Sequence, residues 1–207
     1  MFQSIKNIVF DLGGVIINLD FAKTYQKLAQ LGNCTVEDTI QWVERTQLFK
    51  KYETGVLQED TFFTFIKEAF APTASFTQVE EAWNALLLDI PKERIQRIQG
   101  LRKKYALFLL SNTNYTHIKE VNRKLHQSAG VPDLSDLFDG LYYSYEMGLA
   151  KPHHTIYEHL LTDAKLNASE TVFLDDTEVN LLAPKAAGWK TLHVKEPLTF
   201  IELLKNA

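Results

Sequence analysis

An apolar run over residues 8–10, ended by Asp11, constrains the fold of this chain more than any other feature. A continuous apolar run of this kind is typical of a strand buried on both faces of a parallel sheet. Gly13 and Gly14 follow, and glycine lets a ligand approach the backbone closely. Because open parallel sheets bind ligands beyond the carboxyl ends of their strands, we expect Asp11 in a functional site. A carboxylate that caps the following helix is the alternative interpretation.

Two later apolar runs, over residues 107–110 and 171–174, also end at polar residues. A hydroxyl follows the first of these runs and a pair of carboxylates follows the second. A lysine before a proline lies between them, at the expected start of a helix. Adjacent carboxylates at a strand end repel each other unless a cation is near, although a solvated acidic turn remains the alternative. The polar residues at these points are, in chain order, Asp11, Ser111 with Asn112, Lys151, and the pair Asp175 and Asp176.

From residue 105 onward, strand and helix patterns alternate to the end of the chain. This alternation predicts an α/β fold with a Rossmann-like, doubly wound parallel sheet covered by helices on both faces. The first strand, expected over residues 5–11, must join this sheet because its apolar run needs cover on both sides. Further strands are expected over 105–111, 141–145, 171–175 and 190–194, and helices over 114–127, 153–165, 179–187 and 198–205.

The segment between these parts is interpreted as an inserted α-helical cap. Helices are expected over 20–31, 35–48 and 58–70, then from a capping box at Thr77 and from Pro91 in the first turn. The predicted division is a catalytic core of residues 1–17 and 96–207 and a cap of residues 18–95. The position of the block directly after Asp11 favours a cap, and an ordinary part of the core is the alternative.

Composition excludes several classes of function. The chain has 207 residues and a net charge of −4, so we expect no nucleic-acid partner. It has no stretch of about 20 apolar residues and its first apolar run is broken by Asp11, so we expect neither membrane insertion nor a signal peptide. Cys34 is the single cysteine, which fits a cytoplasmic protein. A monomer or weak homodimer is expected.

The motifs around Asp11, Ser111, Lys151 and Asp175 together resemble the haloacid dehalogenase-like hydrolases, a superfamily dominated by phosphatases with an aspartate nucleophile. All four motifs of that family match, and their spacing covers essentially the whole chain. The residues at these motifs are most similar to a bacterial branch that includes an α-D-glucose-1-phosphatase. The resemblance implies the α/β core and the helical cap described above.

The same resemblance implies a role for each motif. Asp11 would be the nucleophile, and Mg²⁺ would bind its carboxylate, the Gly13 carbonyl and Asp176, which are hard oxygen ligands. Asp175 would bind through water or accept hydrogen bonds behind these ligands, and Asn180 would orient them.

Phosphate would contact the Ser111 hydroxyl, the Asn112 backbone N–H and the Lys151 ammonium, which also pairs with Asp11.

Candidates outside these motifs are weaker. Residues 52–55, which begin with Tyr52 and Glu53, fall where the family places a substrate-specificity loop. Trp83 is interpreted as a core residue and His117 as a histidine on a helix surface. The same interpretation is given to His153 and His154.

Gly13 departs from the family pattern, because most of these phosphatases carry there an aspartate that protonates the leaving group. We therefore expect a Mg²⁺-dependent phosphatase of small phosphorylated metabolites that favours acidic leaving groups, such as a sugar 1-phosphate, over primary alkyl phosphates. Its rate should depend steeply on leaving-group acidity. A 2-haloacid dehalogenase is one alternative, although it needs no metal and therefore no Asp175-Asp176 pair. The other is a weak or inactive binding protein.

Overall fold

The computed structural model describes residues 3–195 and 199–205. Within this part, five parallel strands form one sheet in the order β3-β2-β1-β4-β5. This arrangement confirms the predicted Rossmann-like α/β fold and places β1 at the centre. The strands are β1 (Asn7–Phe10), β2 (Ala106–Ser111), β3 (Gly140–Tyr143), β4 (Thr171–Asp175) and β5 (Lys190–His193).

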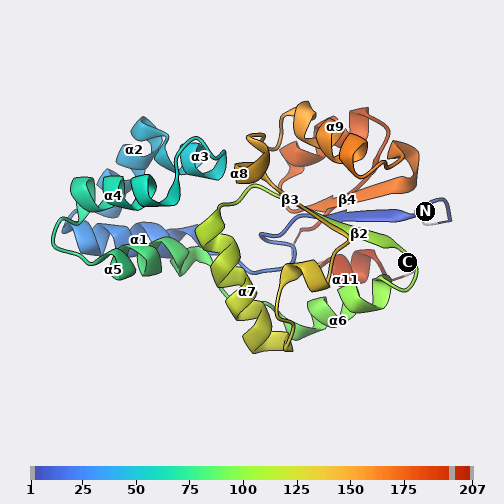
Figure 1. Cartoon of the computed structure of the whole chain (residues 1–207), viewed down its shortest axis with the longest axis horizontal. Helices are drawn as coiled ribbons and strands as arrows, with labels where there is room; N and C mark the ends of the chain where they lie inside the picture. Colours follow the sequence, from blue (N-terminus) through green and yellow to red (C-terminus); the bar gives the residue numbers. More distant parts are fainter. Residues whose placement is uncertain (1–2, 196–198, 206–207) are drawn as a thin grey trace.

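Helices cover both faces of the sheet because side chains alternate between the faces along each strand. Ile8 and Phe10 pack on one face and Val9 on the other, and all three are fully buried. Figure 1 shows the two helical layers. The first comprises α6 (Lys92–Leu101), α7 (Tyr115–Ala129) and α11 (Phe200–Leu203); the second comprises α9 (His154–Asp163) and α10 (Leu182–Ala186), with the short α8 (Ser144–Met147) beside it.

Five helices between β1 and α6 form a separate bundle beyond the carboxyl ends of the strands (Figure 1). They enclose an apolar cluster of their own, rich in aromatic side chains, of which Trp83 and Phe62 are fully buried. This is the packing of a cap that folds around its own core. Its helices are α1 (Phe21–Gly32), α2 (Val36–Thr46), α3 (Leu48–Glu53), α4 (Glu59–Phe70) and α5 (Phe76–Trp83).

Three details of the cap correct the sequence-based expectations. The helix expected over 35–48 is two helices, because Gln47 adopts a left-handed conformation (φ 53°) that ends α2. The capping box that opens α5 is formed by Ser75 and Gln78 rather than at Thr77. Two capping patterns overlap in the sequence here, and the chain uses the earlier one. Pro91 is the residue before α6 rather than its first residue.

Residues that precede the predicted domain boundary at residue 96 already pack against the sheet rather than within the cap. Leu86, Leu87, Ile90 and Ile95 all belong to the apolar cluster under the sheet. The division into residues 1–17, 18–95 and 96–207 stays a prediction, and its second boundary lies within a segment that packs on the core.

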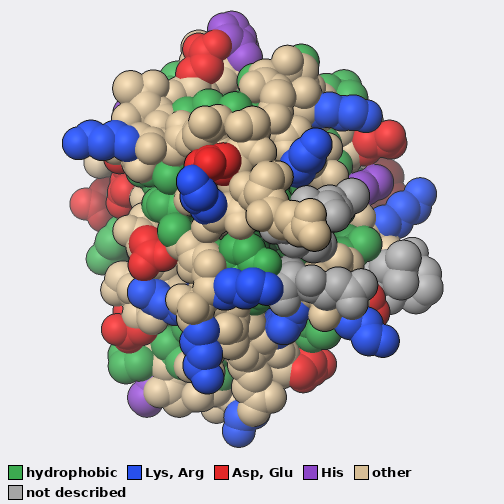
Figure 2. Space-filling model, turned by 90° about the vertical axis from the view of Figure 1, so that its right-hand side faces the viewer, with side chains coloured by type: hydrophobic (Ala, Val, Ile, Leu, Met, Phe, Trp, Pro, Cys, Tyr) green, Lys and Arg blue, Asp and Glu red, His purple; other side chains and the backbone are tan. Residues whose placement is uncertain are grey.

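The surface at the end of the sheet opposite the cap carries basic and acidic side chains that are interspersed (Figure 2). In the part of the chain that the structure describes, no helix combines the length and the apolar character needed to cross a bilayer.

Candidate active site

The sheet brings the polar strand ends together at its centre. β1 lies between β2 and β4, and Phe10 is in register with both Leu109 and Leu174. The next residues on β1 and β4 are Asp11 and Asp175, and Ser111 ends β2 two positions after Leu109. The three residues therefore meet at one edge of the sheet, and all of them are buried.

Lys151 connects two of these carboxylates. Its Nζ lies 2.8 Å from Asp11 Oδ1 and 2.7 Å from Asp175 Oδ2. Burial of the ammonium disfavours its charged form, but the two carboxylates outweigh this effect and raise the pKa of Lys151 above its ordinary value. The lysine is therefore a permanent positive charge inside the site.

The Asn112 side chain fixes the backbone of Lys151. The Lys151 N–H donates to Asn112 Oδ1 at 2.9 Å, and Asn112 Nδ2 donates to the Lys151 carbonyl oxygen, also at 2.9 Å. Because the amide is occupied in this way, the part of Asn112 that can face a phosphate is its backbone N–H. This is the group that the sequence analysis proposed.

Asp175 is fully buried and accepts hydrogen bonds from the protein at both carboxylate oxygens. Thr177 N–H donates to Oδ1 at 2.8 Å, and Asn180 Nδ2 lies 3.0 and 3.1 Å from the two oxygens. Together with Lys151, these donors satisfy most of the carboxylate. The contacts favour a role for Asp175 behind the metal ligands rather than in direct contact with a metal.

The acidic residues fit a divalent cation. Carboxylate oxygens of Asp11, Asp175 and Asp176 all lie within 4.8 Å of one another. Three carboxylates face one ammonium, so negative charge is in excess. Burial and the charge of Asp175 raise the pKa of Asp176. Burial is also the main reason why the pKa of Asp11 is raised to about 7, with Asp175 adding to the shift and Lys151 opposing it. A bound cation would favour the ionised carboxylates.

Gly14 allows the loop after β1 to approach Asp176. Its φ is +66°, and a Cβ at this position would overlap the Asp176 carboxylate. A glycine is therefore required here by both conformation and space. This approach places the loop that contains Gly13 beside Asp176, the most exposed of the three acidic residues.

A small cavity of about 60 Å³ lies between this loop and the cap. Leu12, Gly13 and Ser111 line it from the core. Glu53 and Phe21 line it from the cap, and Phe21 is 61% exposed. Ser111, the proposed phosphate-binding residue, therefore lines a space that the cap closes.

The two cap candidates behave differently. Glu53 lines the cavity, whereas Tyr52 is buried in the cap core and stacks on Phe62 with ring centroids 4.2 Å apart. The Tyr52 hydroxyl lies 2.6 Å from Thr116 Oγ1 of α7. Tyr52 therefore joins the cap to the core. Trp83 is a core residue, as predicted.

The expectation that His117 lies on a helix surface is wrong. Its side chain is buried, lines the cavity, and stacks on Trp83 at 4.6 Å. The helical periodicity of α7 alone does not place His117 among the residues that pack on the sheet. The side chain is buried because the cap folds back over the first turn of α7. His153 and His154 are exposed, as predicted.

Sequence reasoning missed Ser144, which joins three segments. Its Oγ accepts a hydrogen bond from Thr113 N–H at 2.9 Å and lies 2.5 Å from the Glu53 carbonyl oxygen and 3.1 Å from the Thr113 carbonyl oxygen. Its position directly after the third strand was the one available signal. The contacts hold the end of α3 against the core.

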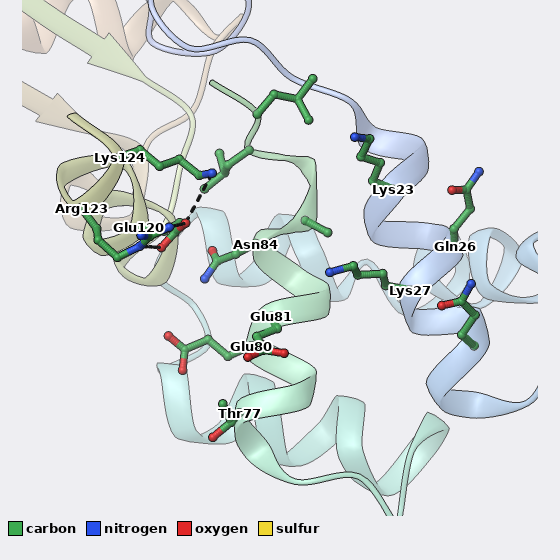
Figure 3. Close-up of a pocket in the computed structure, with 14 residues that line it drawn as sticks. Lys23, Gln26, Lys27, Thr77, Glu80, Glu81, Asn84, Glu120, Arg123 and Lys124 are labelled. Atoms are coloured by element: carbon green, nitrogen blue, oxygen red, sulfur yellow. Dashed lines mark hydrogen bonds and ion pairs between the residues drawn. The ribbon is translucent and has the colours of Figure 1, made fainter. Parts of the chain in front are cut away.

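A wider hollow of about 860 Å³ lies between α1, α5 and α7, away from the strand ends. Figure 3 shows Lys23 and Lys27 on one side and Glu120, Arg123 and Lys124 on the other. Glu120 pairs with Arg123 at 2.6 Å and with Lys124 at 3.6 Å. None of the residues predicted for the active site lines this hollow. Gly13, Ser111 and Asn112 line the smaller cavity instead, so we place the active site there.

Three features define the class of protein. They are a buried aspartate after the first strand, a lysine that bridges it to a second aspartate, and an inserted helical cap, and together they are typical of hydrolases whose active site is built around an aspartate. Residues 5–188 match the family model described as haloacid dehalogenase-like hydrolase. The chain belongs to this family.

Two curated relatives match nearly the whole chain. A D-ribitol-5-phosphate phosphatase of Bacteroides thetaiotaomicron is 33% identical over 187 residues, 90% of each chain. A sesquiterpene phosphatase of Aspergillus oryzae is 26% identical over 98% of this chain and 97% of its own length.

Among solved structures, a HAD family enzyme of Bacteroides thetaiotaomicron superposes with a TM-score of 0.90 at 33% identity, over 97% of this chain and 98% of the other. The wild-type form of this enzyme has also been solved in complex with magnesium and inorganic phosphate, with a TM-score of 0.85 and the same identity, over 96% of this chain and 98% of the other.

Proposed function

We propose that the chain is a Mg²⁺-dependent phosphatase that hydrolyses small phosphorylated metabolites through a phosphorylated Asp11. The observation that carries this proposal is the Lys151 ammonium held between Asp11 and Asp175, with Asp176 beside them. Phosphoryl transfer depends mainly on positioning and charge neutralisation, and this group of side chains offers both. The phosphatase relatives support the reaction class.

The contacts of Asp11 leave one of its oxygens for the reaction. Oδ1 accepts from Leu12 N–H at 2.7 Å and from Lys151 Nζ at 2.8 Å. Asp11 Oδ2 would form a bond to phosphorus while the bond from phosphorus to the leaving oxygen breaks. Water would then attack the phosphorus, break the bond to Asp11 and release inorganic phosphate.

Three groups would hold the phosphate. Ser111 lines the cavity, and its Oγ has no hydrogen-bond partner within residues 3–195 and 199–205. It would donate to a phosphate oxygen, together with the Asn112 backbone N–H. Lys151 would balance the charge on the phosphate and on Asp11.

Asp11, the Gly13 carbonyl and Asp176 would hold Mg²⁺, with Asp175 and Asn180 behind them. The cation would supply positive charge that stabilises the phosphoryl oxygens. A 2-haloacid dehalogenase, the alternative class, needs no metal, so the excess of carboxylates favours the phosphatase.

The substrate would enter beneath the cap. The cavity beside Ser111 is small and is lined by the exposed ring of Phe21. The matching D-ribitol-5-phosphate phosphatase supports a small metabolite, such as a sugar phosphate or a polyol phosphate, as the substrate. A sugar 1-phosphate remains a candidate on the chemical grounds given for Gly13.

A turnover screen tests this function. Purified enzyme would be assayed against sugar 1-phosphates, sugar and polyol phosphates with primary phosphate esters, and 4-nitrophenyl phosphate, with Mg²⁺ or with EDTA. We expect turnover that requires Mg²⁺, and an increased Mg²⁺ requirement or complete loss in Asp176→Ala. Turnover of 2-chloropropionate in EDTA would instead establish the dehalogenase, and no turnover of any compound would establish a binding protein.

A further inference from the structure

The reaction proposed above needs a proton donor that Gly13 cannot provide. When the bond from phosphorus to the leaving oxygen breaks, that oxygen becomes an alkoxide unless a nearby acid protonates it. Displacement in line with Asp11 directs the leaving oxygen away from the strand ends and toward the cap. Two titratable side chains line the cavity in this direction, Glu53 of α3 and His117 of α7.

Both ring nitrogens of His117 are engaged by the protein. Asn114 Oδ1 accepts hydrogen bonds from the backbone N–H of His117 at 3.0 Å and from Trp83 Nε1 at 3.3 Å. The other side-chain group of Asn114, Nδ2, therefore faces His117 Nδ1 at 3.0 Å. Nδ1 is therefore an acceptor, and Nε2 carries the proton and faces the Trp83 carbonyl oxygen at 3.4 Å. Burial lowers the pKa of His117 to about 4. The ring is therefore neutral imidazole near pH 7, which is not a general acid, and we assign it a structural role.

Glu53 has the opposite character. Its backbone is anchored, because Ser144 Oγ contacts its carbonyl oxygen at 2.5 Å. Glu53 lines the cavity, and its carboxyl group has no hydrogen-bond or ion-pair partner within the described residues. The core thus holds the backbone of Glu53 in place while its carboxyl group remains available to a bound molecule.

The surroundings of Glu53 favour its protonated form. Among the described residues, Tyr25 of α1 lies close enough for the charge of Glu53 to affect its pKa, and His117 of α7 lines the same cavity as Glu53. Both groups are neutral near pH 7. Lys50 and Lys51 on its own helix are exposed. Burial raises the pKa of Glu53 to about 7, so a substantial fraction of the carboxyl groups carries a proton at neutral pH.

We propose that Glu53, from the cap, is the general acid and base of this phosphatase in place of the residue missing at Gly13. As Asp11 Oδ2 bonds to phosphorus, the Glu53 O–H gives its proton to the leaving oxygen, and the alcohol departs. The Glu53 carboxylate then takes a proton from the water that attacks phosphorus, so the group returns to its acid form as phosphate leaves. With Glu53 as the acid, the rate of the wild-type enzyme should not depend steeply on leaving-group acidity. The steep dependence that we expected from Gly13 should instead be seen in an enzyme that lacks the Glu53 carboxyl group.

First-turnover rates of Glu53→Gln with two kinds of substrate test this inference. A primary alkyl phosphate, the one that wild type hydrolyses fastest, needs a proton on its leaving oxygen, whereas 4-nitrophenyl phosphate does not. We expect the first turnover of the alkyl ester to slow by about 10²–10⁴-fold and that of the aryl ester to change little. Later turnovers of the aryl ester should slow and leave a burst, because the base is also missing. Glu68→Gln, at an exposed site on α4, is the matched control and should behave as wild type.

The outcomes separate this inference from the function on which it rests. Equal slowing of both first turnovers would show that Glu53 is structural, and unchanged rates would show that it is dispensable; either result overturns the inference and leaves the phosphatase intact. A wild-type enzyme that hydrolyses neither ester would overturn the proposed function and this inference with it.

Discussion

The Asn112 side chain holds Lys151 from both ends of the residue, with 2.9 Å hydrogen bonds to the Lys151 N–H and carbonyl oxygen. The ammonium of Lys151 then reaches Asp11 and Asp175 within 2.8 Å. Asn112 is therefore a positioning residue for the positive charge of the site. Its importance can be measured separately from that of the charge itself.

Asn112→Ala should lower kcat by roughly 10–100-fold, because misplacement of a catalytic group by about 1 Å can cost this much. The phosphate still has its other partners, so KM should change much less than kcat. Steady-state kinetics with 4-nitrophenyl phosphate measure the split. A folded Asn112→Ala enzyme with the kcat of wild type would show that the clamp on Lys151 is unimportant.

Lys151→Met should destabilise the fold, because it leaves two buried carboxylates without their partner. Loss of one member of a buried ion pair costs about 3–5 kcal/mol in free energy of unfolding, and urea denaturation in EDTA measures it. Lys6→Met is the control: Lys6 pairs with Glu170 at 2.7 Å but is 69% exposed, and such surface pairs contribute about 0–1 kcal/mol. Equal effects of the two substitutions would contradict the buried charge pairing.

Gly55→Ala should displace the loop that follows Glu53. Gly55 has φ +70°, and a Cβ there would overlap the Tyr145 carbonyl oxygen of the core. We expect slower first turnover of alkyl phosphates than of aryl phosphates, as in Glu53→Gln. Gly100→Ala in α6 has open space around the new Cβ, so it should keep full activity and gain roughly 0.5–1 kcal/mol of stability. Wild-type kinetics in Gly55→Ala would show that the contact with Tyr145 does not position Glu53.

The pH dependence of the first turnover reports the protonation state of Glu53. Burial raises its pKa to about 7, and the acid form is the one that gives the proton. The rate with an alkyl phosphate should therefore fall as pH rises through about 7, whereas the rate with 4-nitrophenyl phosphate should not show this limb. The limb should disappear in Glu53→Gln. An identical alkaline limb in the variant would assign it to another group.

Much of the core and of the motif residues could be predicted because both follow from local patterns. The apolar runs predict buried parallel strands, and parallel strands bring their carboxyl ends to one edge. This reasoning leads directly to the proximity of Asp11, Ser111 and Asp175. The boundaries within the cap were less accurate, because a left-handed residue such as Gln47 leaves no pattern in the sequence.

The part of the site that closes over the substrate could not be predicted. His117, Ser144 and the backbone of Glu53 acquire their surroundings when the cap folds back on the core, and their contacts join residues about 30 to 90 positions apart. Helical periodicity assigns His117 to a surface because it considers one helix alone. The burial that raises the pKa of Glu53 is a product of the same long-range packing.

The most direct test of the account is the turnover of 4-nitrophenyl phosphate by Asp11→Asn in Mg²⁺. The amide is nearly isosteric with the carboxylate but is a poor nucleophile and a poor metal ligand. We predict a folded protein, with the circular dichroism spectrum of wild type, whose turnover is below a few per cent of the wild-type rate. Turnover above that level by a preparation free of contaminating phosphatase would contradict Asp11 as the nucleophile.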